Sequence, residues 1–211
     1  MASFRGWPAD ALHFFEGLEA DNSKAYWEDN KAIYLTCARE PMDALLAELE
    51  PEFGTPKLFR PYRDVRFSAD KSPYKTAIAA SMAGGGYVQL SSEGLFVGSG
   101  MYHLDVDQLA RYRDAVADDA TGSEIARIVT VARKAGLDVA AHDVLKTAPR
   151  GYPKDHPRIE LLKHKGLIAM KRWAVEPWLG TRKAKDHIVK ALRASGPLND
   201  WLIKNVGAEL S

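Results

Sequence analysis

A short run of strands with helical stretches on both sides of it does most to limit how this chain can fold. Residues 87–90 alternate in polarity with period two, residues 91–94 are rich in turn formers, and residues 95–98 form a second extended run. The small apolar residues 76–82 precede them, across a turn of three glycines at 84–86. This pattern predicts three antiparallel strands that are neighbours in sequence order.

Apolar residues at helical spacing cover most of the rest of the chain. Pro8 suits the first turn of a helix that carries Leu12, Phe15 and Leu18, and a second helix carries residues 26–37 until Pro41 interrupts or restarts it. Further helices are predicted over residues 104–118, 123–134, about 181–194 and 197–206, a short helix after Pro157, and short strands at 137–139 and 167–173. We therefore predict a single α+β domain over residues 1–211, with a mainly antiparallel sheet covered by several helices.

The composition fits a globular protein and limits the kinds of functional site that the chain can form. The chain has 211 residues, 46% of them hydrophobic, which is enough for one core. Cys37 is the single cysteine, so the chain can form neither an internal disulfide nor a zinc site built on cysteines. Residues 1–10 lack the apolar segment of a signal peptide, and no apolar run reaches the ~18 residues of a membrane span. A cytoplasmic protein without a membrane partner is expected.

The net charge of +1 conceals an asymmetry along the chain. Residues 1–59 carry 5 basic and 11 acidic side chains, whereas residues 133–193 carry 15 basic and 6 acidic ones. The basic region could face an anionic partner, or it could face the acidic amino-terminal part of the same chain. We favour the second interpretation, because a protein that is almost neutral overall is not a general polyanion binder.

The most distinctive stretch is residues 60–75, where five cationic side chains stand against two aspartates. Pro61 and Pro73 exclude a regular helix through it. Residues 65–67 are predicted to form a short strand, which would place Asp64 and Arg66 on one face, and residues 68–73 are predicted to form a loop. The stretch is therefore predicted to have irregular or extended backbone, with its charged side chains on one face where it is extended.

So many arginine and lysine side chains in one short stretch are typical of an anion-binding site. The planar guanidinium makes paired, charge-assisted hydrogen bonds to carboxylate and phosphate. Asp64 would orient the arginines, and the hydroxyl of Tyr74 would be a further donor that could also transfer a proton. The predicted ligand-binding residues in this stretch are Arg60, Arg63, Arg66, Lys71 and Lys75.

The same residues carry a resemblance to a known family. The pattern Arg60-x-x-Arg63-Asp64-x-Arg66-Phe67-x-x-x-Lys71-x-x-Tyr74 resembles the motif of a widespread bacterial family, the domain of unknown function 2461 family. The resemblance extends over nearly the whole chain and includes residues 26–27, 100–103, 149–152 and 156–157. It implies which residues belong to the family pattern, and it implies no activity, substrate or cofactor.

Three functions remain open at this stage. The first is an enzyme or binding protein for a small anionic ligand, such as a phosphorylated one, in which Tyr74 or His103 would transfer protons. The second is a nucleic-acid- or protein-binding module that uses the basic region 133–193 with Arg150 and Tyr152. The third is a structural ion-pair network without any ligand. The sequence contains no metal-binding spacing of histidines, and it predicts neither a cofactor nor an oligomeric state.

Overall fold

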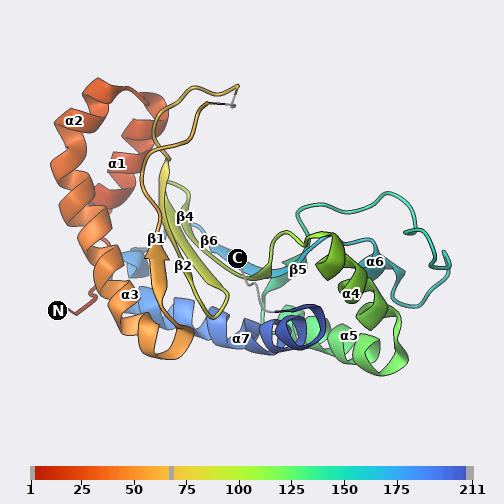
Figure 1. The fold of residues 1–211 in the computed structure, drawn as a ribbon. Coiled ribbons are helices and arrows are strands. Elements are labelled where there is room, and N and C mark those ends of the chain that lie inside the picture. The colour runs from red at the N-terminus through yellow and green to blue at the C-terminus, as the bar shows by residue number, and fades with distance from the viewer. Residues whose placement is uncertain (1–2, 67–68, 208–211) are drawn as a thin grey trace. The chain divides into compact units, whose positions relative to one another are not determined.

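The computed structural model describes residues 3–66 and 69–207 and has an α+β fold (Figure 1). Its strands form a six-stranded antiparallel sheet in the order β1-β2-β3-β4-β6-β5. The strands are β1 (Pro56–Leu58), β2 (Ala77–Met82), β3 (Gly86–Ser91), β4 (Gly94–Met101), β5 (Asp138–Ala140) and β6 (Leu167–Trp173). The predicted fold class, a mainly antiparallel sheet with several helices, is confirmed.

The helices precede and follow these strands. In the amino-terminal part they are α1 (Ala9–Ala20), α2 (Lys24–Ile33), the π-helix η1 (Tyr34–Arg39) and α3 (Glu40–Phe53). After β4 they are α4 (Val106–Ala117), α5 (Asp119–Lys134), the short α6 (Ile159–Leu162), the 3₁₀-helix η2 (Pro177–Gly180) and α7 (Lys183–Val206).

The chain divides into two compact units. The first contains Met1–Ala83, Tyr87–Val97 and Arg172–Lys190. In it α1, α2, η1 and α3 pack on one another, and α3 also contacts β1 and β2. Its core is rich in aromatic side chains, because Phe14 contacts the rings of Phe15, Tyr26, Trp27 and Tyr34 at centroid distances of 5.2 to 6.0 Å.

The second unit contains Gly84–Gly86, Gly98–Lys171 and Ala191–Ser211. Helix α4 packs on α5 and α6, and α5 packs on β5. Asp105 begins α4 with a capping box, in which its carboxylate accepts from the Gln108 N–H and the Gln108 side chain accepts from the Asp105 N–H. Tyr112 is fully buried, and its hydroxyl donates to the Leu161 carbonyl at 3.0 Å.

The strand predictions agree closely with the structure. The three consecutive strands are β2, β3 and β4, which are neighbours in the sheet in that order. The stretches at 137–139 and 167–173 form β5 and β6, which pair antiparallel with Val139 opposite Ala169. Strand β1 was not predicted, because its three residues follow Gly54 without a periodic pattern.

Three helix predictions differ from the structure at their boundaries. Instead of a break at Pro41, the π-turn η1 leads directly into α3, so that the proline lies in the first turn of α3, where the missing N–H costs least. Helix α5 begins at Asp119, rather than at 123, because the carboxylate of Asp118 caps it. Pro197 does not split the last helix: α7 continues through it, with buried Leu192 and Leu198 on the two sides of the proline.

No helix in the described part of the chain combines the length and the apolar character that crossing a membrane requires. The prediction of a single domain stays a prediction, since the boundary between the two compact units runs through β4 and β6.

Candidate functional site

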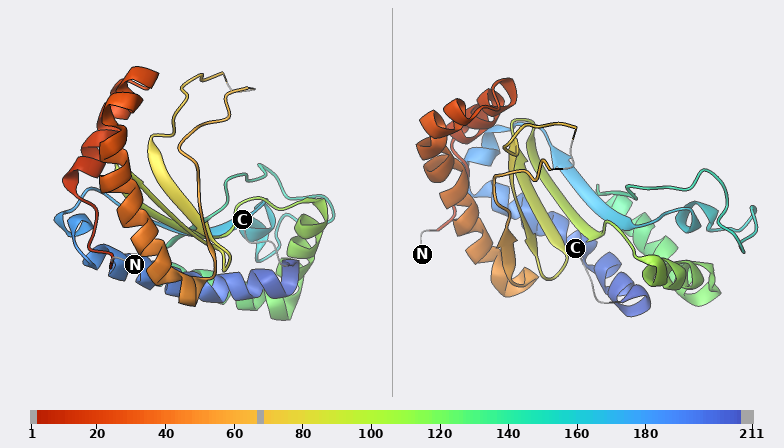
Figure 2. Two further views of the ribbon diagram at one scale, coloured as in Figure 1. Left: turned by 60° about the vertical axis from the view of Figure 1, so that its left-hand side comes forward. Right: turned by 45° about the horizontal axis from the view of Figure 1, so that its top comes forward.

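The stretch singled out in the sequence forms an arm between β1 and β2, which extends beyond the ends of both strands (Figure 2). Its two limbs run antiparallel and are joined by an isolated bridge between Tyr62 and Tyr74. The Arg63 N–H donates to the Pro73 carbonyl at 2.8 Å, and the Lys75 N–H donates to the Pro61 carbonyl at 2.7 Å. We call residues 59–76 the cationic arm.

The base of the cationic arm is fixed to the helices of its own unit. The Asn22 side chain makes two hydrogen bonds to the backbone of Tyr74, accepting from its N–H at 2.9 Å and donating to its carbonyl at 3.1 Å. The Tyr74 ring is stacked on Trp27 with a centroid distance of 4.5 Å and an interplanar angle of 6°. Tyr62, which is 45% exposed, lies against both rings. The stacking on Trp27 and the hydrogen bonds to the Tyr74 backbone together fix both limbs of the arm at this point.

Two ion pairs lie beyond this anchor. Arg66 binds Asp64 in a bidentate manner, with 2.9 Å from Nε to Oδ1 and 2.7 Å from Nη2 to Oδ2. Arg63 donates through Nη1 to Asp70.

The hydrogen bonds from Arg66 lower the pKa of Asp64, with a smaller contribution from Arg60. The hydrogen bonds from Ser72, followed by that from Arg63, lower the pKa of Asp70 to about 2. Both carboxylates are therefore ionised at neutral pH.

The remaining cations of the arm have no carboxylate partner among the described residues. The Lys71 ammonium donates to the Val65 carbonyl at 3.0 Å. The Lys75 ammonium lies 5.3 Å from the centroid of the Phe59 ring. Burial lowers the pKa of Lys75, and the nearby charge of Arg60 lowers it further, so these two like charges are held within electrostatic reach of one another.

Tyr74 is buried in the structure. Its ring is only 4% exposed, and burial raises the pKa of its hydroxyl, with smaller contributions from Tyr62 and Glu28. This placement suits an anchoring side chain, and its role in proton transfer stays a prediction. Residues 65–66 are not in a strand, so the predicted short strand is wrong over them, and Phe67 lies outside the described residues.

The other predicted site residues belong to the second unit. His103 is exposed just after β4. Arg150 is also exposed, and the Tyr152 hydroxyl donates to Asp114 at 2.9 Å. Burial, followed by this hydrogen bond, raises the pKa of Tyr152 to about 12.

Several cations of the basic region 133–193 bind groups of the protein itself. Arg158 donates to the carbonyls of Val116, Ala117 and Asp118 at 2.7 to 3.1 Å, and it thereby closes the carboxyl-terminal end of α4. Lys165 pairs with Asp143 at 2.6 Å. Arg182 and Lys185 both bind Glu48, a residue of the acidic amino-terminal part, at 2.9 and 2.6 Å. These contacts agree with the interpretation that the basic region compensates charges of the same chain.

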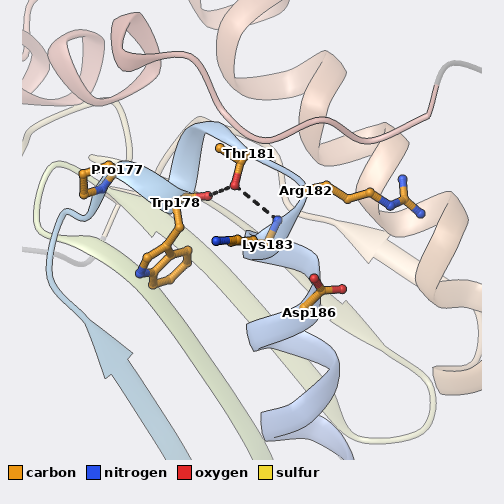
Figure 3. A pocket seen from close by; sticks show the side chains of 6 residues that line it. All are labelled: Pro177, Trp178, Thr181, Arg182, Lys183 and Asp186. Carbon is orange, nitrogen blue, oxygen red and sulfur yellow. Dashed lines mark hydrogen bonds between the residues drawn. The ribbon is translucent and has the colours of Figure 1, made fainter.

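A pocket that the sequence did not suggest lies where η2 meets α7 (Figure 3). It has a volume of about 590 Å³. The Thr181 hydroxyl donates to the Trp178 carbonyl at 2.8 Å and accepts from the Lys183 N–H at 3.3 Å, which orders the start of the helix. The indole of Trp178 packs on His187 at 4.1 Å. The lining residues are Pro177, Trp178, Thr181, Arg182, Lys183 and Asp186.

A row of aromatic side chains on one face of the sheet was also missed. It contains Phe59, Tyr87 and Phe96, with Lys75 at one end and Arg172 at the other. The alternation of Tyr87 and Gln89 with buried Val88 and Leu90 was a signal for this face, but strand register decides which side chains become neighbours. Within residues 3–66 and 69–207, no group of three or more His, Cys, Asp or Glu side chains is placed to hold a metal ion.

Comparison with known proteins places the chain in a family. The family model described as "Conserved hypothetical protein (DUF2461)" matches residues 10–201. The chain belongs to the DUF2461 family. The resemblance inferred from the sequence is thereby confirmed at the level of the family. No curated protein and no solved structure matches the chain. The cationic arm lies within the part that the DUF2461 model covers, and the family description assigns no activity to it.

Proposed function

We propose that this DUF2461 protein binds a small anionic ligand, phosphorylated or carboxylate-bearing, at the cationic arm. The observation that carries the proposal is the pair Arg60 and Lys75. The charge of Arg60 lowers the pKa of Lys75, so the two cations are close together. Neither forms an ion pair with a carboxylate among the described residues, and Asp64 is the carboxylate within electrostatic reach of Arg60. Like charges held together in this way are stabilised by an anion that lies between them.

The two ion pairs of the arm support this role better than a purely structural one. The side chains of Arg66 and Asp64 are 76% and 45% exposed. Exposed pairs of this kind contribute only about 0 to 1 kcal/mol to stability. Their effect is to hold the two guanidinium groups in defined orientations, as a binding site for a planar anion requires.

The test is calorimetric titration of the protein with inorganic phosphate, pyrophosphate and citrate. The double variant Arg60→Gln/Lys75→Gln should lose at least about 90% of the affinity for the anion that binds best, equivalent to about 1.4 kcal/mol or more. Arg5→Gln/Lys31→Gln removes two exposed cations elsewhere in the same unit and is the matched control. Unchanged binding in the arm variant, with both variants folded, would reject the proposal.

A further inference from the structure

The aromatic row beside the cationic arm has the composition of a stacking surface. The ring centroids of Phe59 and Tyr87 are 6.2 Å apart, and those of Tyr87 and Phe96 are 5.8 Å apart. All three rings are only partly buried, whereas the neighbouring strand residues Val88 and Leu90 are fully buried. The strands thus direct one set of side chains into the core and leave the aromatic set half-exposed on the other face.

Strand register brings this row together from separate segments of the first unit. Phe59 follows β1, and its N–H donates to the Ala79 carbonyl of β2 at 2.9 Å. Tyr87 and Phe96 belong to β3 and β4, which are neighbours in the sheet (Figure 1). The row therefore combines side chains from β3, β4 and the segment that follows β1.

Each end of the row carries a cation. The Lys75 ammonium lies over the ring of Phe59, and the Arg172 guanidinium lies over the ring of Phe96 at 4.3 Å from the centroid. Among the described residues, neither cation has a carboxylate partner. The polar side chain beside Tyr87 is the neutral Gln89, which accepts a hydrogen bond from the Tyr87 hydroxyl at 2.7 Å. The charge of this face is thus complementary to an anion.

We propose that this face binds the planar ring of a nucleotide, with its phosphate held by Lys75 of the cationic arm. Half-exposed aromatic rings on a sheet favour a flat heteroaromatic ligand, because stacking stabilises a base without requiring a particular base edge. The adjacent cations supply the charge-assisted hydrogen bonds that a phosphate takes. This inference rests on the proposed function, since it names the class of the anionic ligand that the arm would bind.

The experiment compares three probes, adenosine 5′-monophosphate, adenosine and ribose 5-phosphate, by calorimetric titration. Stacking of one base predicts that the nucleotide binds about tenfold or more tightly than ribose 5-phosphate. Phe96→Leu and Tyr87→Leu should each remove most of that difference while leaving the affinity for ribose 5-phosphate unchanged. Lys75→Gln should weaken binding of the nucleotide and of ribose 5-phosphate more than binding of adenosine.

Controls separate this inference from the proposed function. Tyr102→Leu removes an aromatic side chain of 49% exposure outside the row and should leave all affinities unchanged. Equal affinities for the nucleotide and ribose 5-phosphate would reject stacking and leave anion binding at the arm intact. Absence of binding for every phosphate compound would reject both proposals. Tight nucleotide binding that survives Phe96→Leu and Tyr87→Leu would place the base elsewhere and overturn this inference.

Discussion

At the scale of single residues, Glu48 is a charged side chain that connects separate parts of the fold. Its carboxylate accepts from Lys185 at 2.6 Å, Arg182 at 2.9 Å and the Phe4 N–H at 2.9 Å, and its side chain is 20% exposed. The hydrogen bond from Lys185, with smaller contributions from Phe4, Arg182 and Ser3, lowers the pKa of Glu48 to about 2 from an ordinary 4.5. The ionised carboxylate thus joins the start of the chain to the start of α7.

We expect Glu48→Gln to lower the free energy of unfolding at pH 7 by about 2 kcal/mol, allowing for screening by solvent. Because the pKa is depressed in the folded state, the contribution is complete above about pH 4.5 and is lost as the pH falls toward 2. Guanidinium denaturation at several pH values should therefore show a difference from the wild type that disappears in acid. Glu50→Gln, an exposed position on the same helix, should show little difference at any pH. A difference for Glu48→Gln that is independent of pH would contradict this account.

At the scale of single elements, two helical glycines provide opposite tests of packing. Gly196 lies inside α7, and a Cβ added there would meet nothing within 4 Å beyond its neighbours in the chain. Gly17 lies inside α1, where the same atom would be placed against the Tyr26 hydroxyl, which donates to the Phe14 carbonyl at 2.9 Å.

Gly196→Ala should therefore change the free energy of unfolding by less than about 0.5 kcal/mol, because the gain in backbone entropy is offset by crowding between the new Cβ and the ring of Pro197. Gly17→Ala should lower it by about 1 kcal/mol or more, because the gain in helix propensity is smaller than the cost of displacing the tyrosine ring and its hydrogen bond. Thermal unfolding of both variants measures the two effects. An unchanged midpoint for Gly17→Ala would show that Tyr26 moves aside without cost.

The elements also show what the sequence could predict about the site. Alternation and turn residues identified β2, β3 and β4, and residues 167–173 were assigned to a strand at the observed boundaries. The cationic arm was recognised as a motif, yet its spacing did not show that Arg63 pairs with Asp70 across the tip. The aromatic row could not be predicted, since Phe59, Tyr87, Phe96 and Arg172 become neighbours only through the register of four segments.

At the scale of the whole molecule, the distribution of charge argues against a general polyanion binder. Ion pairs within each unit neutralise part of the excess of basic side chains in residues 133–193. Lys165 pairs with Asp143 in the second unit, and Arg182 and Lys185 pair with Glu48 in the first. Arg158 is directed at backbone carbonyls, and its side chain is only 10% exposed. The net charge of the chain is +1. We therefore expect a small ligand that is recognised locally, rather than a polyanion.

Duplex DNA tests this view, because its bases are already stacked on one another and offer no free ring to the aromatic row. We expect short duplexes to bind weakly near 50 mM salt and to show no measurable binding near 200 mM, with a slope that corresponds to only about two or three phosphate contacts. Fluorescence anisotropy of a labelled duplex measures this slope. Nucleotide binding should depend much less on salt, since a single phosphate is involved. A steep slope for the duplex that falls after Lys154→Gln and Lys190→Gln, two exposed lysines of the basic region, would instead favour a nucleic-acid-binding module there.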